Sequence, residues 1–293
     1  MAIGTALYNG VSGLNSFSTA ISVVSDNVAN ANTTGFKSSG VHFGDMVNNY
    51  YSLFASGGEG MGSKVLEFDT DYAQGTSINT TNWSDLSVSG EGFFAVKDGA
   101  IDATNRNTYY TRDGGFRLDE DGYLVNPLGY NVQGYAYDYD DAAVPPASPY
   151  TINDTETNIK IETPDPDDPT QTLGPTDFVS LRVDQDGTVV GVLANGDEAK
   201  IAKIELATFS NKDGLVREGN NLYSEGAEVG NTFTNIDEPD LFGKMNDYQL
   251  EGSNVDLSKQ MVDMIIFQAS YNANSKTITT SKDMLDTTIG MVR

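Results

Sequence analysis

Apolar residues recur every seven positions at both ends of the chain. The N-terminal repeats are Leu7, Leu14, Ile21 and Val28 in one row, and Phe17, Val24 and Ala31 in a second. The C-terminal repeat is Leu250, Leu257, Met264, Tyr271, Ile278, Leu285 and Val292. Helices must supercoil to keep such a row buried, because a straight helix rotates it away by about 20° per repeat. The pattern predicts two terminal helices, over residues 1–31 and 254–293, that pair as a coiled-coil stem.

The rest of the N-terminal helix surface is unusual for a helix in water. It carries Ser, Asn and Thr in place of the Lys and Glu pairs that stabilise a solvated helix. Because an unpaired charge is costly to desolvate, this neutral surface favours a helix that packs against copies of itself. An amphipathic helix on an ordinary domain core is the alternative interpretation.

Short runs of alternating apolar and polar residues fill residues 76–137 and 179–253. Turn sequences separate the runs, and they include Asp113-Gly114, Asp121-Gly122, Asp186-Gly187 and Asn195-Gly196. Asp-Gly and Asn-Gly pairs favour tight hairpin turns, because these residues tolerate left-handed backbone angles. The two segments predict one central, mainly antiparallel β domain, and the predicted fold class is therefore α+β.

Two other segments lack a regular pattern. Residues 32–75 are expected to form an irregular connector, since their glycine run is not followed by the Gly-Lys-Ser/Thr of a phosphate loop. Residues 138–178 hold seven of the nine prolines and two acidic runs, which leaves room for one hairpin between Tyr150 and Ile161. We expect this second segment to be a proline-rich acidic insertion on the surface.

Charge divides the chain in the same way as the hydrophobic pattern. The formal net charge is −25, yet residues 1–44 contain only Asp26 and Lys37, and residues 254–293 contain four acids and four bases. The entire excess of negative charge therefore lies between the helices. Such acidity disfavours nucleic acid and anionic membranes as partners, because both would be repelled.

The sequence contains few residues that could carry chemistry. It has no cysteine and one histidine, His42, which excludes thiolate sites and histidine-rich zinc sites. The runs Asp119–Gly122 and Asp184–Gly187 resemble the start of a calcium loop, but they lack its closing Glu and are interpreted as hairpin turns. We expect no catalytic, cofactor or metal site and no enzymatic activity.

The N-terminus has neither the basic residues nor the apolar run of a cleaved secretory signal, and no segment has the roughly 20 consecutive apolar residues of a membrane helix. We therefore expect neither such a signal nor membrane insertion. Three functions remain open at this point. They are a structural polymer subunit, a secreted acidic β-rich protein that binds a ligand, and a hydrolase that uses two of the many carboxylates.

Longer motifs resemble the flagellar rod and hook family, the axial proteins of the bacterial flagellum. The matching segments are Asn9–Leu14, Asp26–Lys37, Asp85–Phe94, Tyr110–Phe116, Asp121–Asn126, Leu250–Asp256 and Ala269–Asn274. Within the family, Phe43–Met46, Asn220–Ser224 and Leu285–Arg293 resemble hook subunits more than distal rod subunits. Hook subunits usually carry a sizeable outer domain, however, where this chain has only residues 138–178.

The resemblance implies a structural role without a cofactor. A short hook protein would polymerise into a flexible helical tube that transmits torque from rod to filament, and a distal rod subunit of the basal body is the alternative. Its partners would be copies of itself, the rod, the hook-filament junction, the hook cap and the export apparatus that passes it out unfolded, with no cleaved signal. The protein would then lie in the extracellular hook or in the basal body.

The terminal helices would form the inner core of such a tube. The side chains expected at the assembly interface are the apolar residues of the two repeats. They are Leu7, Leu14, Phe17, Ile21, Val24, Val28, Leu257, Met264, Tyr271, Ile278 and Leu285.

Overall fold

The computed structural model describes residues 2–48, 59–98, 107–139, 150–164, 172–236 and 238–291. The chain forms two compact units. We call residues 1–32, 37–73 and 254–293 the helical unit, and residues 33–36 and 74–253 the β unit. Each unit therefore contains segments that are far apart in the sequence.

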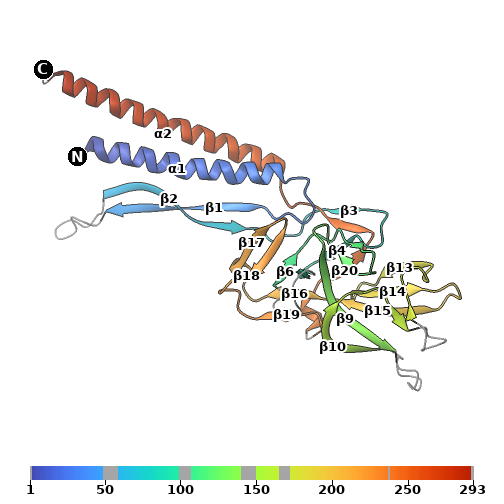
Figure 1. Ribbon diagram of the computed structural model, residues 1–293. Helices are drawn as coiled ribbons and strands as arrows, with labels where there is room; N and C mark the ends of the chain where they lie inside the picture. The colour runs from blue at the N-terminus through green and yellow to red at the C-terminus, as the bar shows by residue number, and fades with distance from the viewer. Residues whose placement is uncertain are drawn as a thin grey trace. The chain divides into compact units, whose positions relative to one another are not determined.

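The helical unit is built on two long antiparallel helices, α1 (Ala2–Ala29) and α2 (Leu257–Met291) (Figure 1). Asn27 Nδ2 lies 3.2 Å from Gln260 Oε1 near one end of the pair. Near the other end, Gly10 lies against Ile278. The two predicted terminal helices are confirmed and they contact each other, while their supercoiling stays a prediction.

The start of α2 differs from the expected cap at Ser253 or Asn254. Asp256 caps the helix, since its Oδ1 accepts hydrogen bonds from the backbone N–H groups of Ser258 (2.9 Å) and Lys259 (3.2 Å). Asn254 instead joins neighbouring chain segments. Its Oδ1 accepts from Ser38 N at 2.8 Å, and its Nδ2 donates to Asp71 O at 2.7 Å.

The segment expected to be an irregular connector forms two long strands. β1 (Ser39–Asn48) pairs antiparallel with β2 (Glu59–Thr70). The register shifts twice, between His42 and Phe43 and between Asp45 and Val47. Each shift reverses which residues face one side, so the alternation that identifies a strand in a sequence is broken. The glycines 57 and 58 of the expected connector lie outside the described residues.

The β1–β2 pair packs along α1, so that α2, α1 and the pair form neighbouring layers (Figure 1). Ser16 Oγ donates to Ser63 O at 3.0 Å, and Asn9 Nδ2 donates to Gly60 O at 3.3 Å. At Gly62, where φ is +88°, an added Cβ would lie 1.9 Å from Ser12 Oγ. Glycine is needed there both for the backbone angle and for the close approach of the strand to the helix.

The β unit contains the remaining strands and two short 3-10 helices. Its first strands are β3 (Ser77–Asn79), β4 (Leu86–Ser89), β5 (Phe93–Asp98), β6 (Thr108–Thr111), β7 (Arg117–Leu118), β8 (Leu124–Val125), β9 (Tyr130–Tyr139), β10 (Tyr150–Asn158), β11 (Thr163–Pro164) and β12 (Thr172–Leu173). They are followed by β13 (Ser180–Val183), β14 (Thr188–Val192), β15 (Glu198–Ile204), β16 (Leu206–Phe209), η1 (Lys212–Gly214), β17 (Leu215–Gly219), β18 (Leu222–Glu225), β19 (Thr232–Thr234), η2 (Pro239–Leu241), β20 (Lys244–Asp247) and β21 (Gln249–Glu251).

The main sheet of this unit runs in the order β13-β14-β15-β9-β5-β6-β18-β17, and every pair in it is antiparallel. Strands from both predicted β segments therefore form one sheet, which confirms a central, mainly antiparallel β domain. Its core contains Leu86, Phe94, Val96, Leu124, Val132, Val189, Ile201 and Ile204, all almost fully buried.

Three of the four predicted turns form hairpins, at Asp121-Gly122, Asp186-Gly187 and Asn195-Gly196. The prediction was wrong for Asp113-Gly114, which connects β6 to β7, because β6 pairs with β5 and β18 whereas β7 pairs with β8. Gly187 N donates to Asp184 O at 2.9 Å and Gly122 N donates to Asp119 O at 3.0 Å. Both glycines have positive φ, +86° for Gly187 and +81° for Gly122. The two runs that resemble the start of a calcium loop are thus the hairpin turns that we predicted.

The proline-rich segment is more ordered and more buried than we expected. Its strand β10 pairs antiparallel with β9, and Ile159 and Ile161 after it are buried in the core of the β unit. Residues 150–161 therefore complete the sheet and its core instead of forming a surface insertion. The acidic run at 165–168 lies outside the described residues.

Candidate assembly interface

The expected interface residues divide between two environments. Val24 is buried and Leu7, Leu14, Phe17, Ile21 and Val28 of α1 are half-buried. On α2, Met264, Ile278 and Leu285 are half-buried, whereas Leu257 and Tyr271 are 43% and 39% exposed. Most of these side chains are thus partly covered within the chain itself, and their part in assembly stays a proposal.

Small residues of α1 allow α2 to approach closely. A Cβ added at Gly10 would lie 2.8 Å from Ile278 Cγ1, and one added at Gly13 would lie 2.8 Å from Asn274 Cγ. Ala20, about two helical turns after Gly13, is fully buried. The heptad rows missed these positions because glycine and asparagine carry no apolar signal, although glycine inside a helix indicates close packing.

An aromatic cluster joins all three layers of the helical unit. The ring centroids of Phe17 on α1 and Phe43 on β1 are 5.6 Å apart, and each lies 6.1 Å from Phe267 on α2. Such tilted and edge-on ring pairs add to the free energy of burial. Phe267 lies outside the predicted heptad row, and Phe43 lies in the segment that we expected to be irregular.

Two polar side chains of the sequence motifs, Asn27 near the C-terminal end of α1 and Lys37 after it, are buried. Asn27 is fully buried, with its Oδ1 accepting from Ser39 N (2.9 Å) and its Nδ2 donating to Ser39 O (2.8 Å). Lys37 is also fully buried, and its Nζ donates to Ala73 O at 2.8 Å. These residues satisfy backbone groups where the strands leave the helices, so their role is to fix the helical unit.

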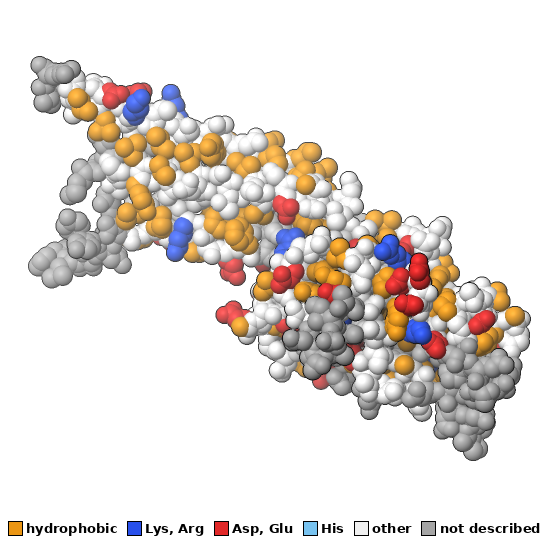
Figure 2. All heavy atoms as spheres, in the orientation of Figure 1, with side chains coloured by type: hydrophobic (Ala, Val, Ile, Leu, Met, Phe, Trp, Pro, Cys, Tyr) orange, Lys and Arg blue, Asp and Glu red, His pale blue; other side chains and the backbone are white. Residues whose placement is uncertain are grey.

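One side of α2 stays open. Its most exposed apolar side chains near the N-terminal end are Met261, Val262, Ile265 and Ile266, which are 50%, 55%, 65% and 52% exposed. Met284, Ile289 and Met291 continue the exposed apolar surface towards the C-terminus. Figure 2 shows apolar side chains gathered along α2 with few charges between them.

An open apolar face of this kind indicates an interaction surface. A helix with apolar side chains on more than one side is normally buried on all of them, and extended exposed apolar patches are uncommon on monomers. The heptad rows predicted only one apolar side for α2. The Ile265-Ile266 pair, which fits no single row, was the signal for the second side.

The β unit holds a buried ion pair. Arg112 Nη1 lies 3.2 Å from Glu251 Oε2, and both side chains are 2% exposed. Arg112 Nη2 also donates to Gly90 O at 2.9 Å, and Glu251 Oε1 accepts from Gly75 N at 3.0 Å. The pair therefore joins four segments of the β unit and serves its architecture.

Two acidic side chains of the β unit, Tyr110 and Asp113, have raised pKa values because they are packed inside it. Burial raises the pKa of Tyr110, and a 2.6 Å hydrogen bond to Glu225 raises it further. Burial raises the pKa of Asp113 too, although hydrogen bonds from Thr34 and Gly115 act in the opposite direction. Both side chains therefore act as hydrogen-bonding partners within the packed β unit.

The described part of the chain offers neither a metal site nor a membrane-spanning helix. No three His, Asp or Glu side chains in it are placed to hold a metal ion. Neither α1 nor α2, as far as the structure describes them, is long and apolar enough to cross a membrane.

Three family descriptions match the chain. They are "Flagella basal body rod protein" over residues 7–37, "Flagellar hook protein FlgE/F/G D1 domain" over residues 87–191, and "Flagellar basal body rod FlgEFG protein C-terminal" over residues 248–291. They follow one another along the chain and cover α1, the first half of the β unit and α2.

Individual relatives match over almost their whole length. The flagellar basal-body rod protein FlgG of Bacillus subtilis (strain 168) is 33% identical over 300 residues, covering 98% of this chain and 99% of that protein. FlgG of Agrobacterium fabrum (strain C58 / ATCC 33970) is 29% identical over 292 residues, with 95% and 96% covered. The flagellar hook protein FlgE of Salmonella typhimurium (strain LT2) is 26% identical over 408 residues, with 96% and 98% covered. The chain therefore belongs to the FlgE/F/G family of flagellar hook and basal-body rod proteins.

Proposed function

We propose that this protein is a rod subunit of the flagellar basal body that polymerises with copies of itself into a helical tube. The length of the chain supports a rod subunit over a hook subunit. The alignment with the Bacillus rod protein needs 300 residues, close to the 293 of this chain, whereas the alignment with the Salmonella hook protein needs 408. The hook relative thus has a long stretch without a counterpart here.

The observation that carries the polymer is the open apolar face of α2, formed by Met261, Val262, Ile265 and Ile266. Burying such a side chain from full exposure is worth about 1.5–3 kcal/mol. These four are 50–65% exposed, so covering the face adds roughly half of that for each and favours association. If α2 of one copy covers a different surface of the next, the contact is head-to-tail. Repeating a head-to-tail contact whose rotation does not close produces a helix of subunits.

Charge supports the same arrangement. α1 carries a single charged side chain, Asp26, so helices packed in the wall of a tube would leave few charges to desolvate. The net charge of −25 falls outside the two helical termini. β units on the outside of the tube would keep most of that charge in water.

A pair of substitutions on the open face tests the polymer. Ile265→Asp with Ile266→Asp places two charges where a neighbour would pack, so tubes seen by electron microscopy should disappear. Val179→Asp is the matched control, because Val179 is a 72% exposed apolar residue of the β unit. The control should still assemble. Tubes formed by the double variant at the wild-type concentration would contradict the proposed contact.

A hook subunit is the second candidate. The resemblance of Phe43–Met46 and Asn220–Ser224 to hook subunits and the full-length match to FlgE favour it. In that case the tube would be the flexible joint that transmits torque from rod to filament. Immunogold labelling of isolated hook-basal bodies separates the two, because a rod subunit places gold within the basal body and a hook subunit places it on the curved hook.

The remaining partners follow from this role. We expect contacts with other axial proteins, namely the rod, the hook-filament junction and the hook cap, and with an export apparatus that passes the chain unfolded. A secreted ligand-binding protein, the alternative from another class, would form small closed oligomers in place of tubes. The role requires no enzymatic activity, and the acidic β unit disfavours nucleic acid.

A further inference from the structure

The helical unit contains an open groove of about 520 Å³ beside the start of α2. Its walls come from the C-terminal half of α1, the first residues of β1, the end of β2 with the residues after it, and the first three turns of α2. Every lining residue belongs to the helical unit. A hollow of this volume can receive several side chains of a partner.

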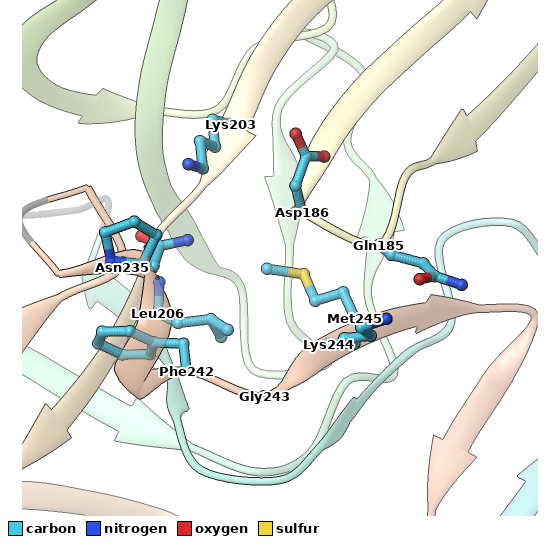
Figure 3. A pocket seen from close by; sticks show the side chains of 10 residues that line it. Gln185, Asp186, Lys203, Leu206, Asn235, Phe242, Gly243, Lys244 and Met245 are labelled. Carbon is cyan, nitrogen blue, oxygen red and sulfur yellow. Dashed lines mark hydrogen bonds between the residues drawn. The ribbon is translucent and has the colours of Figure 1, made fainter.

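A smaller hollow of about 390 Å³ in the β unit has a closed floor (Figure 3). Figure 3 shows the side chain of Met245 crossing its middle, with Leu206 and Phe242 beside it. Met245 and Leu206 are each 1% exposed, and both belong to the core of the β unit. This hollow is therefore part of the packing of the sheet, whereas the groove of the helical unit has exposed residues around it.

Apolar side chains line part of the groove. Val23 of α1, Val41 of β1 and Phe267 of α2 are each half-buried, so a partner can still cover part of each. The groove also borders the open face of α2. Ile266, which is 52% exposed, follows three residues after Asp263 of the groove, and residues at this spacing are neighbours on a helix surface.

The groove carries excess negative charge. Three carboxylates line it, those of Asp69, Asp71 and Asp263, against the single lysine Lys259. His42 Nε2 lies 3.6 Å from Asp69 Oδ2 and adds positive charge only when it is protonated. Asp263 is half-buried and forms no ion pair with any residue that the structure describes. A partner with a cation beside an apolar side chain would complement this groove.

The C-terminal half of α2 has this chemistry. Met284 and Met291 are 52% and 82% exposed, and Lys276 is exposed as well. The spacing of eight and seven residues places these three side chains within about 80° of one another around the helix. Asp283 lies about 20° from Lys276, so this side of the helix carries one charge of each sign. In the described part of the chain Lys276 has no ion-pair partner.

We propose that the groove receives the C-terminal half of α2 from a second copy of this chain. In this contact Lys276 pairs with Asp263, and Asp283 faces Lys259. Met284 covers the apolar lining, because a flexible thioether adapts to an irregular apolar surface. Opposite charges then meet at two places, which fixes the direction of the incoming helix.

This inference rests on the proposed polymer and names the surface that its head-to-tail contact covers. Asp263 and Lys276 are 13 residues apart on one continuous helix, a distance of about 20 Å, so a copy cannot fill its own groove. Each copy offers one groove and one C-terminal half of α2. A contact between two such different surfaces repeats from copy to copy as long as its rotation does not close a ring.

Reversed charges test the contact in the full chain. Asp263→Lys and Lys276→Asp each place like charges opposite each other, so each variant alone should raise the critical concentration for tube formation about tenfold. An equimolar mixture of the two should assemble near the wild-type concentration. The lysine at 263 of one variant then meets the aspartate at 276 of the other, and the unchanged Asp263 meets the unchanged Lys276. Sedimentation of polymer over a concentration series measures all samples.

Two controls reverse charges elsewhere in the helical unit. Lys282→Asp changes an exposed lysine about 120° around α2 from Lys276, and Asp45→Lys changes an exposed carboxylate of β1 outside the groove. Both should change the critical concentration by less than about twofold. Circular dichroism checks that each variant keeps its helices. If Asp263→Lys loses them, the exposed Lys276→Asp carries the test against Lys282→Asp.

Two results would overturn the contact and leave the polymer standing. One is a critical concentration that Lys276→Asp raises no more than Lys282→Asp does. The other is a mixture of the two helical variants that assembles no better than either alone. Wild type that stays monomeric at every concentration would instead contradict the polymer itself, and this contact with it.

Discussion

At the scale of single residues, the polar side chains that the motifs contain act as internal supports. Asn27, Lys37 and Glu251 are each at most 2% exposed, and each forms a hydrogen bond or an ion pair with a distant segment. Their residue types and positions were visible in the sequence. Their burial was not, because a lysine or glutamate in a motif is exposed far more often than buried.

The buried pair of Arg112 and Glu251 predicts a large effect on stability. Glu251→Gln leaves the guanidinium of Arg112 buried without a countercharge and should lower the free energy of unfolding of the β unit by about 3 kcal/mol. Glu162→Gln, which breaks an exposed pair with Lys160, should have a far smaller effect on the free energy of unfolding. Urea unfolding followed by tryptophan fluorescence of Trp83 measures both. Equal losses would show that the buried pair contributes no more than an exposed one.

Asp113 predicts a dependence of stability on pH. Because burial raises its pKa in the folded state above the ordinary 3.8, the folded chain holds the proton more tightly than the unfolded chain. Rising pH through the window above 3.8 therefore lowers the free energy of unfolding. Asp113→Asn keeps an oxygen for the hydrogen bonds from Thr34 and Gly115 but loses this penalty.

The Asn variant should accordingly be more stable than wild type at pH 7, by about 0.5 kcal/mol, the scale of a substitution that keeps its hydrogen bonds. The difference should shrink as the pH falls to 4. Thermal unfolding at both values checks the sign. A variant that is less stable than wild type at pH 7 would mean that the ionised carboxylate is favoured in the folded chain.

At the scale of elements, glycines in α1 decide how closely the helices pack. Gly4 has no atom within 4 Å of an added Cβ, whereas Gly10 would meet Ile278 at 2.8 Å. Gly4→Ala should stabilise the helical unit by about 0.5 kcal/mol through helix propensity. Gly10→Ala should destabilise it by about 1 kcal/mol, because overpacking outweighs the same gain. Melting of the helical circular dichroism signal measures both, and stabilisation by Gly10→Ala would contradict the close contact.

Elements with a simple period could be predicted, and the others could not. The seven-residue rows identified both terminal helices, and three of the four Asp-Gly and Asn-Gly pairs identified hairpins of the β unit. The β1–β2 pair was missed because two register shifts, at His42 and Asp45, break its alternation. Residues 150–161 were expected to hold at most one hairpin on the surface, but they form one strand, β10, that pairs with β9. The neighbouring prolines concealed that Ile159 and Ile161 after it are in the core.

The candidate interface was predicted only in part for a related reason. A heptad row marks the side of a helix that faces its partner, and Met264, Ile278 and Leu285 are half-buried. It contains no information about a second apolar side, which on α2 includes Val262 and Ile265. Contacts made by Gly13 and Asn274 were equally hidden, because those residues are neither large nor apolar.

At the scale of the whole molecule, exposed apolar surface and negative charge lie in different parts of the chain. The two helices combine near neutrality with an apolar face on α2 that nothing in the described chain covers. The middle of the sequence carries the full net charge of −25. A subunit with one part that favours contact with its copies and another that favours water is suited to the wall of a tube in water. The length of the chain supports our proposal that this tube is the rod.

Negative-stain electron microscopy of the purified full chain at increasing concentration tests this account most directly. We expect continuous helical tubes above a critical concentration, and we expect the variant with Ile265→Asp and Ile266→Asp to form none while Val179→Asp still forms them. Small closed oligomers at every concentration, or tubes that form equally well from the double variant, would contradict assembly through the open face of α2.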